Sequence, residues 1–488
     1  MENKLYYGDN LEILRNDIAD NSVDLIYLDP PFNSKADYNM LFKEENGTKS
    51  VAQVKAFSDF WHWDRKAQDT YDELINNPKY PEKLKKLIIA YDTFLGHNDL
   101  FAYLVMLTIR LVEMRRVLKD TGTLYLHCDP TASHYIKLVM DNVFGHSCYL
   151  NEIIWSYRTG GAGKRWFSRK HDIIFYYSKS NKYNFYPLKE RVYYEKSFFT
   201  QNIDEKGRYY ADVLLRDVFD GVINLVNEKQ KKVECISVKP VINLSKERLG
   251  YPTQKPVGLL EVLIRAATKE GDLVLDPFCG CGTALDAAEK LHRRWIGMDI
   301  THVAVGVIKN RIIETYPDAK FGIIGEPTDL EGAKELANQD RFQFQAWALS
   351  LMGATPSDKM SGDHGIDGTL RNTYMGKNYY GIIQVKSGKV SPRDIRDLKG
   401  TINTQKADYG IFITLERPSK DMITEAVSSG NLKCDWGEEI PKVQILTIEE
   451  LLNNKKPELP APPNKYNTAK KGKRANKESI QKSIDDSI

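Results

Sequence analysis

Asp29-Pro30-Pro31-Phe32 carries groups that suit a flat ring with an exocyclic amino group. The apolar run 23–28 before it predicts a buried strand. The two prolines end this strand, because proline cannot continue a hydrogen-bonded ladder and restricts the residue before it. Asp29 is therefore expected at the carboxyl end of a strand, the edge where open α/β sheets bind ligands. Its carboxylate and the stiffened backbone carbonyls can accept hydrogen bonds, and Phe32 offers an aromatic face. A plain loop remains an alternative explanation of these four residues alone.

A second stretch whose residues could bind a ligand is Asp276-Pro277-Phe278-Cys279-Gly280-Cys281-Gly282-Thr283. It overlaps the end of the predicted strand 273–276 and leads into an alanine-rich helix. Glycines between a strand and a helix let backbone N–H groups approach a small ligand closely. Their spacing is not the full dinucleotide fingerprint, which argues against NAD. The next predicted strand, 295–299, ends in Asp299. In nucleoside-binding sheets an acid at this place accepts hydrogen bonds from ribose hydroxyls.

Two further polar residues end predicted strands. Asp9 follows strand 4–7, and it can face a ligand, cap the helix that begins next, or do both. His127 lies near the end of strand 123–129. It can face the same site, although a hydrogen-bonded structural histidine is the more common arrangement.

The elements that must position these residues alternate between strand and helix, which predicts a parallel α/β sheet. A helix from Asn98 to about Lys119 has apolar residues at helical spacing and is expected to pack on that sheet. Residues 33–97 interrupt the alternation and form either a functional insertion or a small packed subdomain. The basic loop 160–165 is glycine-rich but lacks Walker spacing, so we expect it near DNA phosphates. Tyrosines and dispersed basic residues in 182–241 fit a DNA-reading module.

Taken together, these motifs resemble those of DNA amino-methyltransferases. The catalytic tetrapeptide comes first, the recognition module follows, and the motifs Thr253-Gln254-Lys255-Pro256, 276–283 and Ile296-Gly297-x-Asp299 come last. That order is similar to the β group of the family. The resemblance covers residues 1 to about 320. It implies a Rossmann-like S-adenosylmethionine-dependent methyltransferase sheet with an inserted target-recognition module, acting on double-stranded DNA.

The resemblance also implies roles for individual residues. An adenine is flipped out of the duplex, Phe32 stacks on it, and Asp29 and the Pro30 carbonyl accept hydrogens from its amino group. The expected catalytic residues are Asp29, Pro30, Pro31 and Phe32. The residues expected to bind S-adenosylmethionine are Asp9, Lys255, Asp276, Phe278, Gly280, Gly282, Thr283 and Asp299. Transfer to cytosine N4 is the alternative within this class, but relatives that carry it out more often have Ser in place of Asp29.

Past Pro327 a second set of motifs appears. Asp367 precedes one predicted strand, and Gln384 and Lys386 share one face of the strand 379–386, because alternate residues of a strand lie on the same side. This arrangement resembles the Mrr-like branch of the PD-(D/E)xK restriction endonucleases. The resemblance implies that Asp367 and Gln384 bind Mg²⁺ and that Lys386 positions water, with Gln384 in place of the usual second carboxylate. A domain that binds DNA without cutting it is one alternative. Another is a nuclease whose methyltransferase half only recognises DNA.

Length and charge pattern complete the sequence-based prediction. The chain of 488 residues is expected to comprise a catalytic half 1–180 with the insertion 33–97, a recognition module 181–245, a cofactor half 246–328, a smaller nuclease-like α/β domain 329–452 and a basic disordered tail 453–488. Residues 455–488 hold nine Lys or Arg and four Asp or Glu, so the other 454 residues sum to about −2 and DNA contact must be a local patch. Six scattered cysteines, no signal peptide and no long apolar run predict a cytoplasmic protein. The family resemblance implies a role in a restriction–modification system, as a homodimer or as a restriction-system subunit.

Overall fold

The computed structural model describes residues 2–31, 37–43, 49–58, 62–158, 165, 167–197, 202–227, 232–242, 245, 247–249, 251, 253–357, 365–374, 377–434 and 439–460. The chain divides into two compact units, Met1–Asp363 and His364–Ile488. No helix in these described ranges is long and apolar enough to cross a membrane.

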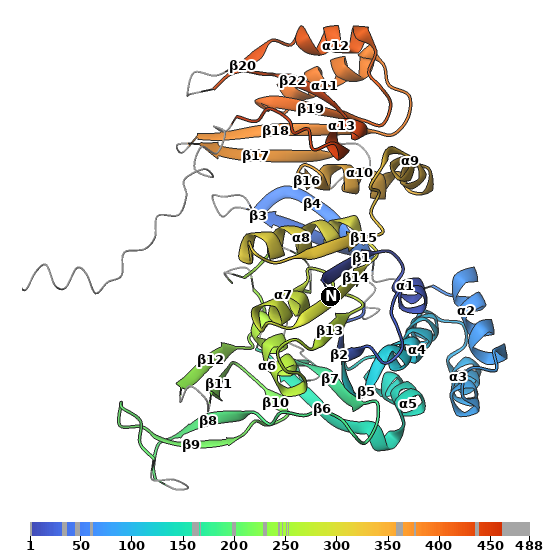
Figure 1. Ribbon diagram of the computed structural model, residues 1–488, viewed down its shortest axis with the longest axis vertical. Helices are drawn as coiled ribbons and strands as arrows, with labels where there is room; N and C mark the ends of the chain where they lie inside the picture. Colours follow the sequence, from blue (N-terminus) through green and yellow to red (C-terminus); the bar gives the residue numbers. More distant parts are fainter. Residues whose placement is uncertain are drawn as a thin grey trace, which may run out of the picture. The chain divides into compact units, whose positions relative to one another are not determined.

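The first unit is organised around a nine-stranded sheet with the order β10-β6-β7-β5-β2-β13-β14-β1-β15 (Figure 1). Its strands are β1 (Asn3–Tyr7), β2 (Val23–Leu28), β5 (Leu118–Cys128), β6 (Tyr149–Ser156), β7 (His171–Ser178), β10 (Val218–Phe219), β13 (Leu273–Asp276), β14 (Arg294–Asp299) and β15 (Phe321–Ile324). The six strands from β5 to β15 pair in parallel, and β7 is antiparallel to both β5 and β6. The predicted α/β sheet is confirmed.

Helices cover both faces of this sheet, because alternate residues of its strands point to opposite sides. Ile26 and Leu28 of β2 belong to one hydrophobic core, which also contains residues of α1 (Asn10–Asn16), α4 (Asp99–Val117) and α5 (Ser133–Phe144). Leu25 and Tyr27 belong to the other core, with α6 (Val257–Ala267), α7 (Thr283–Lys290) and α8 (His302–Thr315). The strand before Asp29 is thus buried on both sides, as its mostly apolar sequence predicts.

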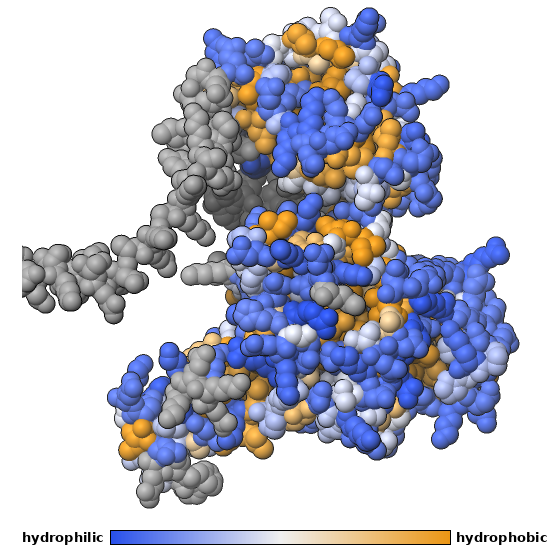
Figure 2. Space-filling view, viewed as in Figure 1, coloured by the Kyte–Doolittle hydropathy of each residue, from blue (hydrophilic) through white to orange (hydrophobic). Residues whose placement is uncertain are grey.

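The insertion between β2 and α4 contains a hairpin, β3 (Asp37–Lys43) and β4 (Lys49–Ser58), and two helices, α2 (Arg65–Asn76) and α3 (Glu82–Leu95). The helices pack beside α4, with Trp63 stacked on Phe101 at 5.0 Å between ring centroids. Hydrophilic residues cover the side of α2 and α3 that is visible in Figure 2. This part of the insertion is a packed helical layer, which agrees with the expectation of a small packed subdomain.

A four-stranded antiparallel sheet, β12-β11-β8-β9, lies in the segment 181–245, for which the sequence predicts a recognition module (Figure 1). Its strands are β8 (Lys189–Tyr194), β9 (Tyr209–Leu214), β11 (Val222–Asn227) and β12 (Lys232–Ser237). Leu225 is buried in the same core as α6, so one face of this sheet packs against the nine-stranded sheet and its helices. Elsewhere in the module basic and aromatic side chains stack in pairs, with the Arg191 guanidinium 3.6 Å from the Tyr210 ring and that of Arg208 3.8 Å from the Tyr193 ring.

The remaining elements of the first unit are the 3₁₀ helix η1 (His146–Cys148), α9 (Leu330–Gln339), α10 (Arg341–Ser350) and β16 (Thr355–Pro356). In the second unit β18 (Lys377–Lys386) pairs antiparallel with β17 (Gly368–Tyr374) and parallel with β19 (Tyr409–Thr414), which pairs in parallel with β22 (Val443–Thr447). Also in this unit are α11 (Pro392–Thr404), α12 (Lys420–Val427), β20 (Asn431–Lys433), β21 (Glu439–Pro441) and α13 (Ile448–Leu452). The second unit is therefore a smaller α/β domain with its own core.

Candidate active site

Four carboxylates gather along one edge of the nine-stranded sheet. Asp9 and Asp29 follow β1 and β2, and Asp276 and Asp299 end β13 and β14. These four strands are parallel neighbours in the order β2-β13-β14-β1, so their carboxyl ends meet at the same edge. The structure therefore brings together the acids that the sequence motifs single out, although they are spread over nearly 300 residues of the chain.

Asp29 forms an ion pair with Lys255, whose Nζ donates to Oδ2 at 2.5 Å. The Lys255 side chain is only 8% exposed. It sits in a loop fixed by Gln254, whose amide accepts a hydrogen bond from Leu249 N at 2.9 Å and donates one to Glu247 O at 2.8 Å. Lys255 was expected to bind the cofactor, and its contact with the tetrapeptide is a connection that the sequence did not reveal.

The turn after β13 has the backbone that its glycines predict. Gly280 and Gly282 have φ angles of +50° and +75°, and Gly282 caps α7. A Cβ atom on Gly282 would lie 2.8 Å from Ile308 Cγ1, so a side chain there would disturb the packing of α8. The Gly280 N–H donates to Asp299 Oδ2 at 3.0 Å, and the Phe278 N–H donates to Asp276 Oδ1 at 3.1 Å. The turn is thereby fastened to both acids.

Burial changes the acidity of these two carboxyl groups. It raises the pKa of Asp276, and the negative charges of Asp29 and Asp299 add to the effect. Burial also raises the pKa of Asp299 to about 6, against the hydrogen bonds from Thr301 and Gly280 that favour its ionised form. Two carboxyl groups whose charges are disfavoured make this part of the edge receptive to a ligand that brings positive charge or hydrogen-bond donors.

Asp9 has a structural role beside any ligand contact. It caps α1 by accepting from Leu11 N at 2.9 Å, as predicted, and it pairs with Arg110 at 2.7 Å and Lys66 at 2.9 Å. Burial opposes its ionisation, but the two cations outweigh burial and lower the pKa of Asp9. Arg110 also donates to Asn10 Oδ1 at 2.6 Å. The sequence analysis missed Arg110 because it lies within the apolar pattern of α4.

Thr283 and the first turn of α7 are held by a second buried arginine that the sequence analysis missed. Arg311 of α8 donates to Asp286 at 2.9 Å and 2.6 Å, to Cys281 O at 3.0 Å and to Thr283 Oγ1 at 3.4 Å. Tyr316 donates to Asp286 Oδ1 at 2.6 Å. The sequence does not indicate that Arg311 is buried, because a basic residue in an amphipathic helix usually faces solvent.

His127 is fully buried and hydrogen-bonded, the more common of its two expected roles. Its Nδ1 lies 3.2 Å from Tyr27 Oη and its Nε2 lies 3.0 Å from Asp172 Oδ2. Asp172 also accepts from Tyr157 Oη at 3.0 Å. Pro30 and Pro31 extend from β2 as expected, whereas Phe32 and most of the basic loop, 159–164, lie outside the described residues.

In the second unit, the predicted residues lie on β18 and directly before its neighbour β17. Asp367 precedes β17 and accepts a hydrogen bond from Val385 N at 2.7 Å. Gln384 and Lys386 alternate on β18, and Gln384 is only 3% exposed. Within the described residues no three His, Cys, Asp or Glu side chains lie close enough together to hold a metal ion. The Mg²⁺ site expected at Asp367 and Gln384 thus has no support from a carboxylate cluster.

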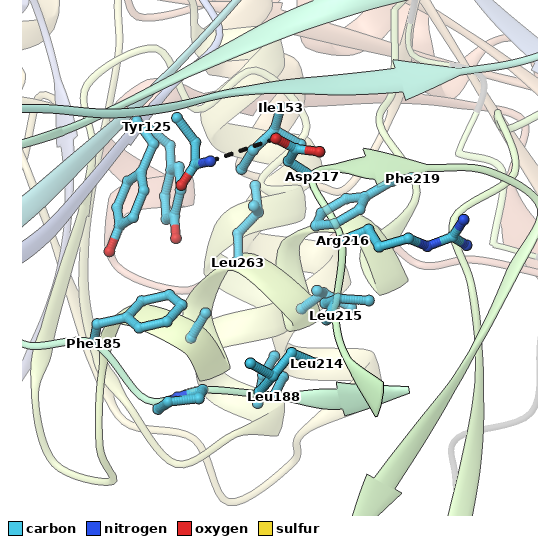
Figure 3. A pocket seen from close by; sticks show the side chains of 15 residues that line it. Tyr125, Ile153, Phe185, Leu188, Leu214, Leu215, Arg216, Asp217, Phe219 and Leu263 are labelled. Carbon is cyan, nitrogen blue, oxygen red and sulfur yellow. Dashed lines mark hydrogen bonds between the residues drawn. The ribbon is translucent and has the colours of Figure 1, made fainter. Parts of the chain in front are cut away.

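A pocket of about 460 Å³ lies elsewhere on the sheet, between β5–β7, α6 and the segments that enter β8 and leave β9 (Figure 3). Tyr125, Phe185, Leu214 and Leu263 are among its walls, and at its side Asn151 Nδ2 donates to Asp217 Oδ2 at 3.5 Å. None of the four edge carboxylates lines it. It is therefore distinct from the candidate active site.

Comparison with known proteins gives two family matches. Residues 23–310 match the model of N6/N4 methyltransferases, described as DNA methylase. Residues 342–453 match a second model, described as NACHT-associated inactive restriction endonuclease 1. The second match agrees with the expected restriction-endonuclease-like domain, but its description speaks against the expected cleavage.

Among curated proteins, the chain is 29% identical over 316 residues to the type II methyltransferase M.HpaI of Haemophilus parainfluenzae, covering 64% of this chain and 74% of that one. It is 31% identical over 219 residues to M1.MboII of Moraxella bovis, covering 43% and 78%. Among solved structures it is similar to a DNA modification methylase from Thermus thermophilus in complex with S-adenosylmethionine, at 18% identity, 67% and 100% coverage and a TM-score of 0.38. It is also similar to the cytosine-N4-specific PvuII DNA methyltransferase, at 13% identity, 66% and 95% coverage and a TM-score of 0.37.

Proposed function

Because the chain belongs to the DNA methylase family, which matches residues 23–310, we propose that it transfers a methyl group from S-adenosylmethionine to adenine N6 at a specific site in double-stranded DNA. One observation carries this proposal. Asp29 stands at the carboxyl end of β2, directly beside β13 and its glycine turn. An acceptor for a target amine therefore adjoins a backbone turn that suits a small ligand.

The residues along the edge fit S-adenosylmethionine. The left-handed backbone at Gly280 and Gly282 keeps the turn free of side chains, and a Cβ on Gly282 would collide with Ile308. We assign the turn, with Asp276, to the methionine part of the cofactor and Asp299 to its ribose hydroxyls. Phe278 and Thr283 flank the turn, and Asp9 is assigned to the adenine edge. When bound, the cofactor supplies a methyl group activated by a sulfonium.

The chain's own residues prepare the acceptor amine. Lys255 occupies Oδ2 of Asp29, so we assign Oδ1 of Asp29 and the Pro30 carbonyl to the two hydrogens of the adenine amino group. Those bonds draw the nitrogen lone pair out of conjugation and aim it at the methyl group. Phe32 supplies the stacking face for the flipped base, and flipping costs a few kcal/mol of unstacking. Pro31 stiffens the segment that presents these groups.

Transfer of tritium from labelled S-adenosylmethionine to a library of DNA duplexes tests this proposal, followed by digestion to nucleosides to identify the base. We expect N6-methyladenine from the wild-type protein and a loss of at least a hundredfold in kcat for Asp29→Asn, which removes the charge but keeps the shape. N4-methylcytosine as the product would favour the alternative base. Wild-type rates for Asp29→Asn would overturn the role of Asp29.

For the second unit we propose a restriction-endonuclease-like fold that binds DNA without cutting it. Its family match is described as inactive, Gln384 stands where a second carboxylate is usual, and the Asp367 carboxylate already accepts a backbone N–H. Incubating the full chain with unmethylated plasmid and Mg²⁺ or Mn²⁺ tests this. We expect intact plasmid, and cleavage that disappears in Lys386→Ala would restore the expectation of an Mg²⁺-dependent nuclease.

A further inference from the structure

Strands β8 and β9 form a ribbon that stands clear of the hydrophobic cores, and in Figure 1 it extends away from the nine-stranded sheet. Every residue of the two strands is half-buried or exposed. β8 pairs with β11 through Glu190 and Leu225, and Leu225 is buried in the core. Paired residues point to the same face of a sheet, so Arg191, the next residue, lies on the face turned away from the core. This outer face of the ribbon is available for contact with a partner.

Arg191 is held on the outer face by two kinds of contact. Its Nε and Nη2 donate to the two carboxylate oxygens of Asp212, at 2.7 and 2.8 Å. Its guanidinium also lies over the ring of Tyr210, 3.6 Å from the centroid. The carboxylate thus binds one side edge of the guanidinium, and the ring covers one of its flat faces.

Arg208 has the same surroundings, built from different residues. Its Nε donates to Asp204 Oδ2 at 2.9 Å, and its Nη2 lies 2.7 Å from the same oxygen. Its guanidinium lies 3.8 Å from the centroid of the Tyr193 ring. Because Tyr193 and Tyr210 are directly opposite each other on β8 and β9, the two stacked pairs form one continuous row.

The end of each guanidinium is left for a ligand. In both arginines Nη1 has no hydrogen-bond partner among the described residues, and the side chains of Arg191 and Arg208 are 19% and 49% exposed. Two parallel N–H groups at the end of a guanidinium match O6 and N7 of guanine, and the major groove of DNA admits a two-stranded ribbon. An arginine that is already oriented loses little freedom on binding.

Charge favours a base edge over a phosphate as the ligand. Each guanidinium is paired with a carboxylate within 2.9 Å, so its positive charge is largely balanced. A phosphate would be repelled by that carboxylate, whereas the neutral edge of a guanine is recognised by the direction of its hydrogen bonds. These contacts therefore suit the reading of sequence better than general attraction to the DNA backbone.

We infer that Arg191 and Arg208 determine which DNA sequence is methylated, each by donating two hydrogen bonds to a guanine in the major groove. This inference rests on the proposed function. Arg191 lies two residues from Tyr193 and Arg208 two residues from Tyr210, on opposite sides of the tyrosine pair. Their Cα atoms are thus roughly 13 Å apart along the ribbon, which corresponds to about four base-pair steps. The target site should contain two guanines within that span.

Selection of bound duplexes from a random DNA library by the full chain, followed by sequencing, tests the inference. The wild-type protein should select one motif that contains the two guanines. Arg191→Lys keeps the positive charge but removes the flat end that donates two hydrogen bonds. It should reduce the preference for one of the guanines by about tenfold to a hundredfold, and Arg208→Lys should do the same for the other.

Arg216→Lys is the matched control, because Arg216 pairs with Glu190 at 3.2 Å, on the opposite face of β8. It should select the wild-type motif. Should Arg191→Lys not fold, Asp212→Asn keeps Arg191 and weakens the contact that orients it, and it should relax the same position.

A wild-type protein that selects no motif, or a motif without guanine, would overturn the inference. The wild-type motif in both lysine variants would overturn it as well. Tritium transfer to the selected motif tests the proposed function separately, since a motif that is bound but not methylated would overturn methyl transfer and leave the role of the two arginines in place.

Discussion

The Asp29 carboxylate is shared between a cation of the protein and the proposed target amine. Lys255 holds Oδ2 at 2.5 Å with an ammonium group that is almost fully buried, so the position of Oδ1 follows from this ion pair. An acceptor that is fixed in advance loses little freedom when the amine arrives, which is how enzymes obtain rate from geometry. At the scale of the residue, the proposed active site is thus a set of oriented acceptors rather than a nucleophile.

Gly282→Ala should weaken the binding of S-adenosylmethionine at least tenfold. The substitution places a Cβ at a φ of +75° and 2.8 Å from Ile308 Cγ1, so both the turn and α8 must shift. Gly96→Ala is the matched control, because Gly96 has a φ of +65° but its Cβ would meet nothing within 4 Å. We expect this control to lose about 1 kcal/mol of folding free energy and to keep the wild-type Kd in calorimetry. Equal affinities for the two variants would remove the turn from the cofactor site.

Affinity for S-adenosylmethionine should fall as the pH is lowered through about 6. Burial raises the pKa of Asp299 to about 6, and the ribose hydroxyls are assigned to its ionised form. Below this pH the carboxyl group is protonated before the cofactor binds, so the Kd should rise by up to about tenfold per pH unit. The free energy of unfolding changes in the opposite direction. Because the pKa of Asp299 is higher in the native state than in the unfolded chain, its protonation at lower pH stabilises the fold.

Calorimetry at pH 7.5, 6.5 and 5.5 measures this dependence. Asp299→Asn should bind weakly at every pH and flatten the curve, whereas Asp204→Asn, a change in the loop between β8 and β9, should leave it as in the wild type. An unchanged pH dependence in Asp299→Asn would show that another group is responsible.

At the scale of the elements, the α/β sheet and its ligand-binding edge could be predicted better than the contacts that cross the sheet. Strand periodicity, the prolines after β2 and the glycines after β13 are local signals, and they located the edge that carries Asp29, Asp276 and Asp299. The contacts of Lys255 with Asp29 and of Arg110 with Asp9 join residues 226 and 101 positions apart. Such pairings depend on how helices pack on the sheet, which no local pattern contains.

Arg110→Met should destabilise the first unit by about 3 kcal/mol. Arg110 is 7% exposed and joins α4 to Asp9 and Asn10, while Asn10 Nδ2 in turn donates to Pro277 O at 2.6 Å. Its loss leaves the largely buried Asp9 without its main partner. Denaturation by urea measures the change, with the exposed Arg115→Met as a control that should stay within about 0.5 kcal/mol. Equal free energies of unfolding for the two variants would mean that the contacts of Arg110 do not stabilise the packing of α1.

At the scale of the whole molecule, the chain combines a methyltransferase unit with a smaller α/β unit that has its own core. The position of the boundary between the two units decides which fragment keeps the packing of the first unit. The sequence pattern suggests a break near residue 328, but α10 packs on α8, with the His302 N–H donating to Gln343 Oε1 at 3.2 Å. Phe344 and Trp347 of α10 are fully buried.

A fragment of residues 1–357 should therefore fold and keep the methyl-transfer rate of the full chain, whereas a fragment of residues 1–328 should unfold at a lower temperature by several degrees. Differential scanning calorimetry and tritium transfer compare the two. A fragment 1–357 that folds but transfers no methyl group would show that the second unit contributes to the active site. Equal melting temperatures would show that α9 and α10 do not support α8.

The most direct test of the central claim is the pattern of modified bases in the DNA of a methylation-free bacterial host that expresses this chain. Sequencing that reads modified bases should find N6-methyladenine at one short motif with the wild-type protein and no modified base with Asp29→Ala at equal expression. Unmodified DNA with the wild-type protein, or the same methylation with Asp29→Ala, would contradict an active site built on Asp29.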